Sequence, residues 1–278
     1  MTAPSKDAVL GWGLTRLREL PWRATRDPWA VLVSEVMLQQ TQVARVVPKW
    51  LAFMHEFPDP VVCASAPLGD VLRLWHGHGY PRRARNLHEA AKVLAAAGAF
   101  PADLDGLLAL PGVGAYTARA VLAFAFESDA AVVDTNIARV LARVHGLTMT
   151  ARQAQSAADA WLPVGDSWAW NQCLMELGAT VCRPANPGCA DCPLADRCAW
   201  RGSGPDPAPG TAGVSRPQAR FEGSERQARG RLMAALTAGS VRARDAERVM
   251  AHRAADRLAE SLCSEGLVVL DGEWLRLP

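Results

Sequence analysis

Four cysteines late in the chain, Cys182, Cys189, Cys192 and Cys198, constrain its fold more than any other feature. Their spacing, C-x6-C-x2-C-x5-C, describes a compact loop that closes on itself. Four thiolates so close together in a reducing compartment indicate a metal site, either zinc or an iron–sulfur cluster. Zinc ribbons usually use two C-x-x-C pairs, whereas here one pair is flanked by single cysteines. The spacing therefore favours a cubane held by a single loop.

Composition excludes several classes of protein. The 278 residues are 50% hydrophobic, which is enough to bury a substantial core. The sequence has no charged N-terminal segment followed by an apolar one, and no apolar run long enough to cross a bilayer. We therefore expect a cytoplasmic protein with no membrane partner. An odd count of 7 cysteines argues against a disulfide framework, so Cys63, Cys173 and Cys263 are expected to be ordinary thiols.

Net charge does not identify a partner. Lys and Arg number 30 against 28 Asp and Glu, a formal charge of +2. Only Arg82, Arg83 and Arg85 form an evident basic cluster. Such a cluster suits either a nucleic-acid contact or a solvated face.

Apolar residues recur with helical spacing up to the cysteines, and no β alternation of any length interrupts them. The clearest helix follows Asp27-Pro28, where Trp29, Leu32 and Val33 begin an apolar stripe. A mostly helical protein is expected. The expected helices are 7–18, 29–43, 46–56, 60–64, 68–74, 82–97, 103–109, 115–126, 135–144, 150–162 and 167–181.

A glycine-rich turn, Leu110-Pro111-Gly112-Val113-Gly114, joins two of these helices. Its amides and the start of the second helix can bind an anion, and a phosphate is the natural guest. Asp134 and Asn136 follow an apolar run and begin the next helix. There Asp134 either caps free amides or serves as a catalytic carboxylate.

Glu35 lies off the apolar stripe of its helix, on a face with Leu38, Gln39 and Gln42. It is either an exposed surface residue or a proton donor with a raised pKa. Periodicity alone favours the surface alternative, because charged side chains are mostly exposed.

The chain changes character after the cysteines. The segment Gly202–Gly213, GSGPDPAPGTAG, is a flexible linker by composition. Helices are expected beyond it at 225–238, 243–252 and 254–265, followed by a hairpin with an Asp271-Gly272 turn. This order suggests a small winged-helix-like module, whose balanced charge suits DNA binding and protein contact equally.

Together these residues resemble the helix-hairpin-helix base-excision DNA glycosylases, and within them the adenine DNA glycosylases of the MutY family. The resemblance covers roughly residues 15–200. It rests on LPWR at 20–23, SEVMLQQTQV at 34–43, Gly79-Tyr80 with RARNL at 83–87, the glycine-rich turn, Asp134 with Asn136, and the four-cysteine loop.

The resemblance implies a mostly α, two-lobed helix-hairpin-helix glycosylase fold, with DNA between a six-helix barrel and a 4Fe–4S cluster domain. The expected domains are 1–26 (an N-terminal helix joining the cluster domain), 27–136 (barrel), 137–200 (cluster domain), 201–220 (flexible linker) and 221–278 (winged-helix-like module). The last segment is too short for the Nudix-like domain that this family commonly carries.

The resemblance also implies an activity: a monomeric enzyme that excises adenine mispaired with 8-oxoguanine or guanine from double-stranded DNA. Glu35 would protonate adenine N7 and Asp134 would stabilise the oxocarbenium-like sugar, with Tyr116 and Asn136 positioning these groups and the water. Gln39 and Tyr80 would wedge into the duplex as the base is extruded. The expected DNA contacts are Arg18, Trp22, Arg23, Leu38, Gln39, Gln40, Thr41, Tyr80, Gly112, Val113 and Gly114, and the expected cluster ligands are the four cysteines.

Three other functions fit parts of the pattern. One is a glycosylase for thymine or uracil mismatches. A second, an endonuclease III-like lyase, needs a lysine in the hairpin helix, but no lysine follows Lys92 and Tyr116 stands at that position. The third is a non-catalytic, redox-sensing DNA-binding regulator. The chain also departs from the family at Thr135, where glycine is common, and at His78, where an apolar residue is usual.

Overall fold

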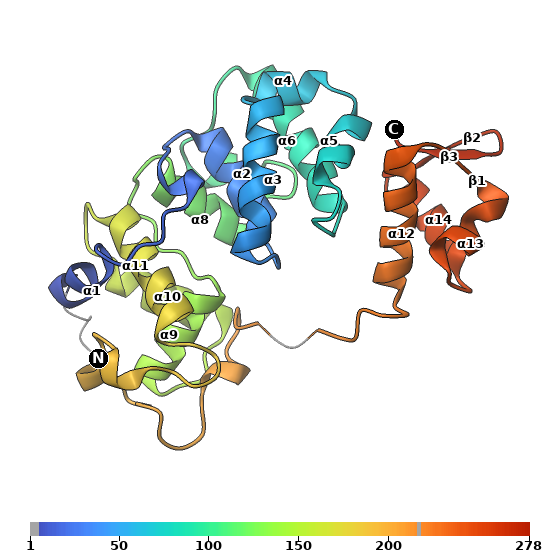
Figure 1. Ribbon diagram of the computed structural model, residues 1–278. Helices are drawn as coiled ribbons and strands as arrows, with labels where there is room; N and C mark the ends of the chain where they lie inside the picture. The colour runs from blue at the N-terminus through green and yellow to red at the C-terminus, as the bar shows by residue number, and fades with distance from the viewer. Residues whose placement is uncertain (1–5, 216–217) are drawn as a thin grey trace. The chain divides into compact units, whose positions relative to one another are not determined.

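The computed structural model describes residues 6–215 and 218–278 (Figure 1). Its elements confirm the mostly helical fold expected from the sequence. None of the helices in these two ranges is long and apolar enough to cross a membrane. The helices before the cysteines are α1 Lys6–Gly13, α2 Pro28–Leu38, α3 Val43–Glu56, α4 Pro60–Ser65, α5 Leu68–Trp75, α6 Arg82–Ala97, α7 Leu104–Leu108, α8 Ala115–Phe124, α9 Thr135–His145, α10 Ala151–Trp161 and α11 Ser167–Thr180.

The chain divides into two compact units and passes between them several times. Unit 1 comprises Met1–Val31, Ala102–Leu108 and Val113–Pro217. Unit 2 comprises Leu32–Pro101, Ala109–Gly112 and Gln218–Pro278. In unit 1, α11 packs against α1, α8 and α9, and in unit 2, α6 packs against α4 and α5.

Two helices end earlier than their periodicity predicts. α2 ends at Leu38 rather than at residue 43, because Arg83 takes the carbonyls of Val36, Met37 and Gln39 as hydrogen-bond acceptors. Those carbonyls would otherwise continue the helix. α1 ends at Gly13 rather than at residue 18. A Cβ at position 13 would lie 2.4 Å from Cys173 Sγ of α11.

The expected flexible linker is wrong for residues 206–213, which pack on unit 1. A 3₁₀ turn, Ala208–Gly210, contacts α9, and Ala208 is 1% exposed. Asp206 pairs with Arg143 at 2.6 Å, and Thr211 Oγ1 accepts a hydrogen bond from Met149 N. Composition missed this strap because an ion pair and backbone hydrogen bonds order it. Residues 216–217 of the expected linker lie outside the described residues.

The C-terminal module (221–278) contains the expected helices and hairpin, and one strand that sequence reasoning missed. Its elements are α12 Glu225–Ala238, β1 Val241–Arg242, α13 Ala246–Met250, α14 Ala255–Ser264, β2 Val269–Asp271 and β3 Trp274–Arg276. The sheet is antiparallel in the order β1-β3-β2, with Leu275 paired to both Val241 and Leu270. β1 escaped notice because two residues are too few to show alternation.

The module docks on α5 and α6 within unit 2. Glu265 Oε1 lies 3.2 Å from Arg82 Nη2, and the carbonyl of Glu265 accepts a hydrogen bond from Arg85 Nη1. The Gly69 amide donates to the carbonyl of Pro278 at 2.9 Å. Two arginines of the basic cluster therefore contact the module: Arg85 is half-buried there, whereas the Arg82 side chain stays 63% exposed, as a solvated face predicts.

Candidate active site and metal centre

Asp134 lies at the N-terminal end of α9 in unit 1 and caps that helix. Its Oδ1 accepts hydrogen bonds from the amides of Asn136 (3.0 Å) and Ile137 (2.7 Å), and its Oδ2 accepts one from Asn136 Nδ2 (2.7 Å). The cap interpretation is confirmed. Oδ2 accepts only this one hydrogen bond and keeps a further lone pair, so capping leaves Asp134 able to interact with a positive charge.

Asp134 is half-buried and held in place by its donors. Burial raises the pKa of its carboxyl, while the hydrogen bonds from Ile137 and Asn136 and the charge of Arg139 oppose the rise. A carboxylate held by preset donors in a low-dielectric site attracts a developing cation more strongly than one in water.

Arg139 joins this cap to the cysteine loop. Its Nη2 donates to Asn136 Oδ1 (2.8 Å) and to the carbonyl of Gly178 (2.6 Å), and its Nε donates to the carbonyl of Cys182 (2.7 Å). A Cβ at position 178 would lie 2.5 Å from Asn136 Cβ. Only glycine therefore lets α11 approach α9 this closely.

The glycine-rich turn forms the hairpin between α7 and α8. Leu110 and Val113 anchor it, with 4% and 8% of their surface exposed. Gly112 has a φ of +78°, and a Cβ there would lie 2.7 Å from Asn86 Cβ, so the position requires glycine. Gly114 is the N-cap of α8 and makes no side-chain cap hydrogen bond, and the start of a helix favours an anion. Tyr116 lies in that turn and is half-buried.

Three predicted DNA contacts near the N-terminus are packed within unit 1. Glu176, fully buried on α11, pairs with Arg18 (2.6 Å) and Arg23 (3.0 Å). Arg23 also donates to Gln172 Oε1, and Trp22 is 7% exposed. Because Trp22 is buried and Arg23 is half-buried, their placement does not support a direct contact with DNA. Arg18 is exposed, so its predicted contact with DNA stays open.

Glu35 is buried on α2 with 5% of its surface exposed, so the surface alternative is wrong. Periodicity misled because α2 is buried on every face. Residues 31–37 are all buried, including Leu32 and Met37 at 0% and 1% exposure. A buried carboxyl group is the kind that general-acid catalysis uses.

Arg83, on the first turn of α6, holds two loops of unit 2 together. We call these loops, 38–42 and 76–81, the probing loops. The Arg83 guanidinium also lies over Trp75 and Tyr80, 5.5 and 5.3 Å from the ring centres. Its acceptors are the carbonyls of Val36, Met37, Gln39, His78 and Gly79 and the hydroxyl of Thr41, at 2.6–3.3 Å.

Each probing loop contains a residue with unusual backbone geometry. Gln40 has a φ of +55° and Tyr80 a φ of +48°, in the region that favours glycine. Gln40 is exposed, and Tyr80 is 40% exposed. Strain of this kind concentrates at functional sites. Leu38, Gln39 and Thr41 are half-buried beside them.

His78 fills an apolar position as a neutral ring. It is 6% exposed, and its ring lies edge-on to Trp75 with centroids 5.4 Å apart. Burial and, to a smaller extent, the charge of Arg83 lower its pKa to about 4. The departure from the family pattern at this position therefore keeps an uncharged interior.

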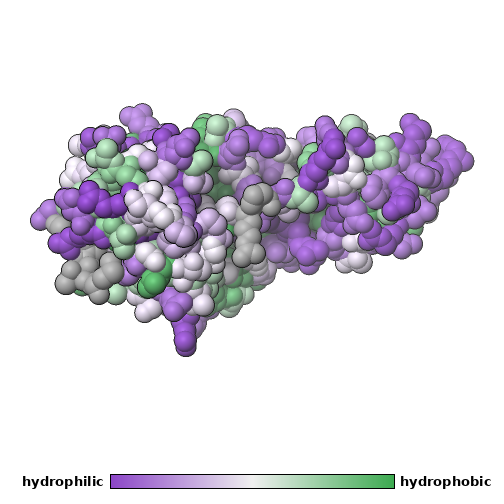
Figure 2. Space-filling model, turned by 90° about the horizontal axis from the view of Figure 1, so that it is seen from below, coloured by the Kyte–Doolittle hydropathy of each residue, from purple (hydrophilic) through white to green (hydrophobic). Residues whose placement is uncertain are grey.

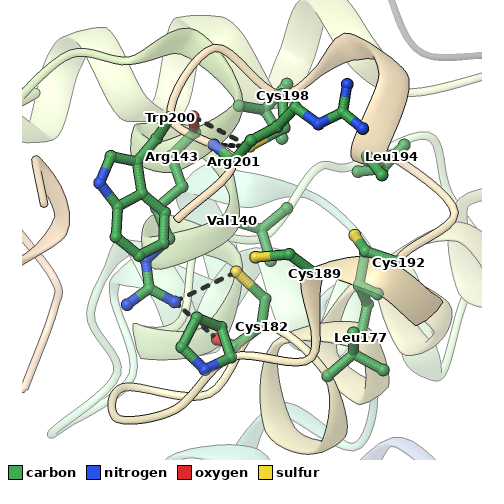
Figure 3. Close-up of a pocket in the computed structure, with 14 residues that line it drawn as sticks. Val140, Arg143, Leu177, Cys182, Cys189, Cys192, Leu194, Cys198, Trp200 and Arg201 are labelled. Atoms are coloured by element: carbon green, nitrogen blue, oxygen red, sulfur yellow. Dashed lines mark hydrogen bonds between the residues drawn. The ribbon is translucent and has the colours of Figure 1, made fainter. Parts of the chain in front are cut away.

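The four predicted ligands line one pocket in unit 1 (Figure 3). Leu177, Leu194 and Trp200 complete its apolar walls. In the described ranges, no three His, Cys, Asp or Glu side chains are close enough to hold a single metal ion. Four thiols spread around one pocket suit a polynuclear iron–sulfur group, whose irons each take one thiolate.

Hydrogen-bond donors surround the cysteine sulfurs, as a thiolate-bound cluster requires. Arg143 Nη1 and the Arg201 amide donate to the sulfurs of Cys182 and Cys198, each at 3.4 Å. The side chain of Arg143 is 1% exposed, and its Cζ lies over the Trp200 ring, 4.4 Å from the ring centre. Burial raises the pKa of Cys192 to about 11, so a cation must compensate its thiolate.

Sequence reasoning missed the arginines that organise these sites. Arg139 and Arg143 lie one helical turn apart on α9 and point to the same cysteine loop, a spacing visible in the sequence. The sequence places Arg83 in a basic cluster and in the RARNL motif, and neither pattern shows that it binds two loops. No local signal identifies Asp206 as the partner of Arg143, because 63 residues separate them.

Comparisons with known proteins agree with this geometry. Residues 33–164 match the HhH-GPD superfamily of base excision DNA repair proteins. An adenine DNA glycosylase of Mycobacterium tuberculosis is 43% identical over 96% of this chain and 91% of its own length. That of Mycolicibacterium smegmatis is 43% identical over 94% and 91%. A thermostable thymine-DNA glycosylase structure has a TM-score of 0.65 at 29% identity, covering 70% of this chain and 94% of its own.

The helical fold, the hairpin and the matched segment make this chain a member of the HhH-GPD superfamily of base excision DNA repair proteins. Within that superfamily it belongs to the adenine DNA glycosylase family, as the identity along nearly its whole length shows.

Proposed function

We propose that the protein removes adenine lying opposite 8-oxoguanine or guanine in double-stranded DNA, as a monomer and without cutting the strand. One observation carries the proposal: Glu35 is a buried carboxyl on α2, inside the segment that matches the superfamily. The adenine DNA glycosylase relatives supply the identity of the base.

In this reaction Glu35 donates a proton to adenine N7, so the base leaves as a neutral group when the C1′–N9 bond breaks. Positive charge then develops on the sugar, and ionised Asp134 stabilises it. Asn136 keeps Asp134 in place through its amide, and Tyr116 contributes to positioning the water that adds to C1′. The two carboxyl groups work in different environments, one among apolar side chains and one among fixed donors.

DNA contacts follow from the same assignment. The amides of Gly112, Val113 and Gly114 bind a backbone phosphate, which the uncapped start of α8 favours. Gln39 and Tyr80 enter the stack left by the extruded adenine, with Leu38, Gln40 and Thr41 beside them. Arg18 is the exposed N-terminal arginine that can reach a phosphate.

The four cysteines would hold a 4Fe–4S cluster, which when bound braces the loop that they form. Arg143 and the Arg201 amide supply hydrogen bonds to the ligand sulfurs. Purified protein with a broad visible absorption would support the cluster, and a colourless protein containing zinc would contradict it.

The test compares the wild type with Glu35→Gln on an oligonucleotide duplex that contains adenine opposite 8-oxoguanine. The wild type should release adenine and leave a strand that alkali breaks. Glu35→Gln should lower the single-turnover rate about 10²–10⁴-fold, because it removes the proton donor. The matched control is Glu56→Gln, which removes an exposed carboxylate at the end of α3. Equal rates of adenine release by Glu35→Gln and the wild type would exclude Glu35 as the proton donor. A wild type that releases no base from any mismatch would favour the non-catalytic regulator.

Excision of thymine or uracil from mismatches is a second candidate, favoured by the likeness to the thymine-DNA glycosylase structure. A wild-type protein that excises the pyrimidine from T:G or U:G duplexes and leaves an A:8-oxoguanine duplex intact would establish this second activity. Borohydride should trap no DNA adduct at the hairpin helix, because the chain has no lysine after Lys92.

A further inference from the structure

The polypeptide that leads into the C-terminal module reaches both probing loops of unit 2. Gln218 Nε2 donates to Gln40 Oε1 at 2.9 Å, and Tyr80 donates its hydroxyl hydrogen to Gln218 Oε1 at 3.4 Å. Arg226, on the first turn of α12, donates to Gln218 Oε1 and lies 3.5 Å from the Tyr80 hydroxyl. Four side chains from three separate segments thus meet at one place.

Docking of the module fixes this meeting place. Glu265 pairs with Arg82 of α6 and, at 2.6 Å, with Arg229 of α12. These arginines hold the pKa of Glu265 at about 2, so it stays ionised at neutral pH. The carbonyl of Pro278 is bound by α5 at the other end of the module. The two anchors lie outside the meeting place, so Gln218 and Arg226 are delivered to the loops by the module.

The meeting place has the chemistry of a base-reading surface. Arg226 has neutral acceptors among the described residues, Gln218 Oε1 and the Ala219 carbonyl, so no carboxylate neutralises its charge. Arg and Gln side chains recognise the edges of purines by paired hydrogen bonds. Phe221 is 56% exposed beside Arg226 and offers a stacking face. The module's visible surface, at the right of Figure 2, is mostly hydrophilic, which suits a charged partner.

The module is also shared with relatives. An alignment that covers 96% of the chain must include most of its last 58 residues, and the mycobacterial adenine DNA glycosylase aligns in this way.

We propose that Gln218 and Arg226 determine specificity by contacting the base opposite the excised adenine, and that the C-terminal module holds them beside Gln40 and Tyr80 for this purpose. This inference rests on the proposed function. It assigns the module to substrate discrimination rather than to general DNA affinity.

The experiment measures single-turnover excision of adenine from three duplexes, with 8-oxoguanine, guanine or a tetrahydrofuran abasic analogue opposite the adenine. Arg226→Ala should slow excision opposite 8-oxoguanine at least about fivefold, the effect of losing one paired contact to a base. Excision opposite the abasic analogue should change less than about twofold, because that duplex offers no base edge to lose. Gln218→Ala should show the same pattern with a smaller loss.

Two variants control for charge and shape. Arg248→Ala removes an exposed arginine elsewhere on the module and should leave all three rates unchanged. Arg226→Lys keeps the charge but not the planar fork, and should fail to restore discrimination. Thermal unfolding of each variant reports whether the module still folds.

If Arg226→Ala slows excision equally on all three duplexes, the inference is overturned and Arg226 contacts a phosphate instead. Unchanged rates on all three duplexes would also overturn the inference, because Arg226 would then make no contact that affects excision. If the wild type releases adenine from none of the duplexes, the proposed function fails and the inference falls with it. The two failures differ, because only the first leaves an active wild type.

Discussion

Arg83 in unit 2, which is half-buried, and Arg143 in unit 1, which is buried, both collect oxygen atoms from loops, yet they differ in charge balance. Arg143 donates to the carbonyls of Arg183 and Pro184 and pairs with Asp206. Burial lowers its pKa, but the hydrogen bonds of Asp206 and Cys182 outweigh burial and raise it. Arg83 has carbonyl and hydroxyl acceptors, and burial lowers its pKa to about 10.

This difference separates a brace from a charged contact surface. The Arg143 cluster is electrically compensated, which suits a loop that must remain closed around a metal. Arg83 stays protonated at neutral pH and puts an uncompensated positive charge behind the probing loops, where a polyanion is expected to bind. The same kind of residue thus serves stability in one unit and ligand binding in the other.

The largest effect should come from Arg143→Ala. Removing it leaves Asp206 and several carbonyls without their donor, which should lower the free energy of unfolding by about 3–5 kcal/mol. Denaturant unfolding measures the loss. Arg201→Ala is the control, because Arg201 has a side chain 58% exposed and a distant ion pair at 3.9 Å. Equal stability of the two variants would show that Arg143 is no brace.

His78→Leu should reveal through pH that His78 is buried beside the charge of Arg83. Because burial and then Arg83 lower the pKa of His78 to about 4, between pH 6.5 and about 4 the unfolded chain binds a proton at His78 and the folded chain does not. Wild type should therefore lose up to about 3 kcal/mol of stability relative to His78→Leu as pH falls through this window. Near pH 8 the difference in stability between the two proteins should be constant. His76→Leu, which replaces an exposed histidine of the same loop, is the matched control.

Arg83→Ala should have the smallest effect on stability, about 1–3 kcal/mol, because loop carbonyls that lose a donor can bind water. Its effect on duplex affinity should be larger than that of Arg82→Ala, since Arg83 orders both probing loops. Equilibrium binding to an A:8-oxoguanine duplex measures this. A loss of stability without any loss of affinity would make Arg83 a brace like Arg143.

The sequence predicted the helices well because their apolar spacing is a local property. It predicted the cysteine cavity because all four ligands lie within one short loop. It misplaced Glu35, since periodicity cannot show that α2 is buried on every face. It missed the 206–213 strap and the docking of the module, because both depend on pairs far apart in the chain, such as Arg143 with Asp206 and Arg82 with Glu265.

Gly178 has a genetic consequence. It carries no reactive group and touches neither DNA nor metal in any role proposed above, yet a Cβ there would collide with Asn136 and its carbonyl. Every single-base change that replaces this glycine adds at least a methyl group to that contact. In a mutational scan scored by mutator phenotype, substitutions at position 178 should therefore have effects as large as those at the proposed catalytic residues, and larger than those at neighbouring positions of α11.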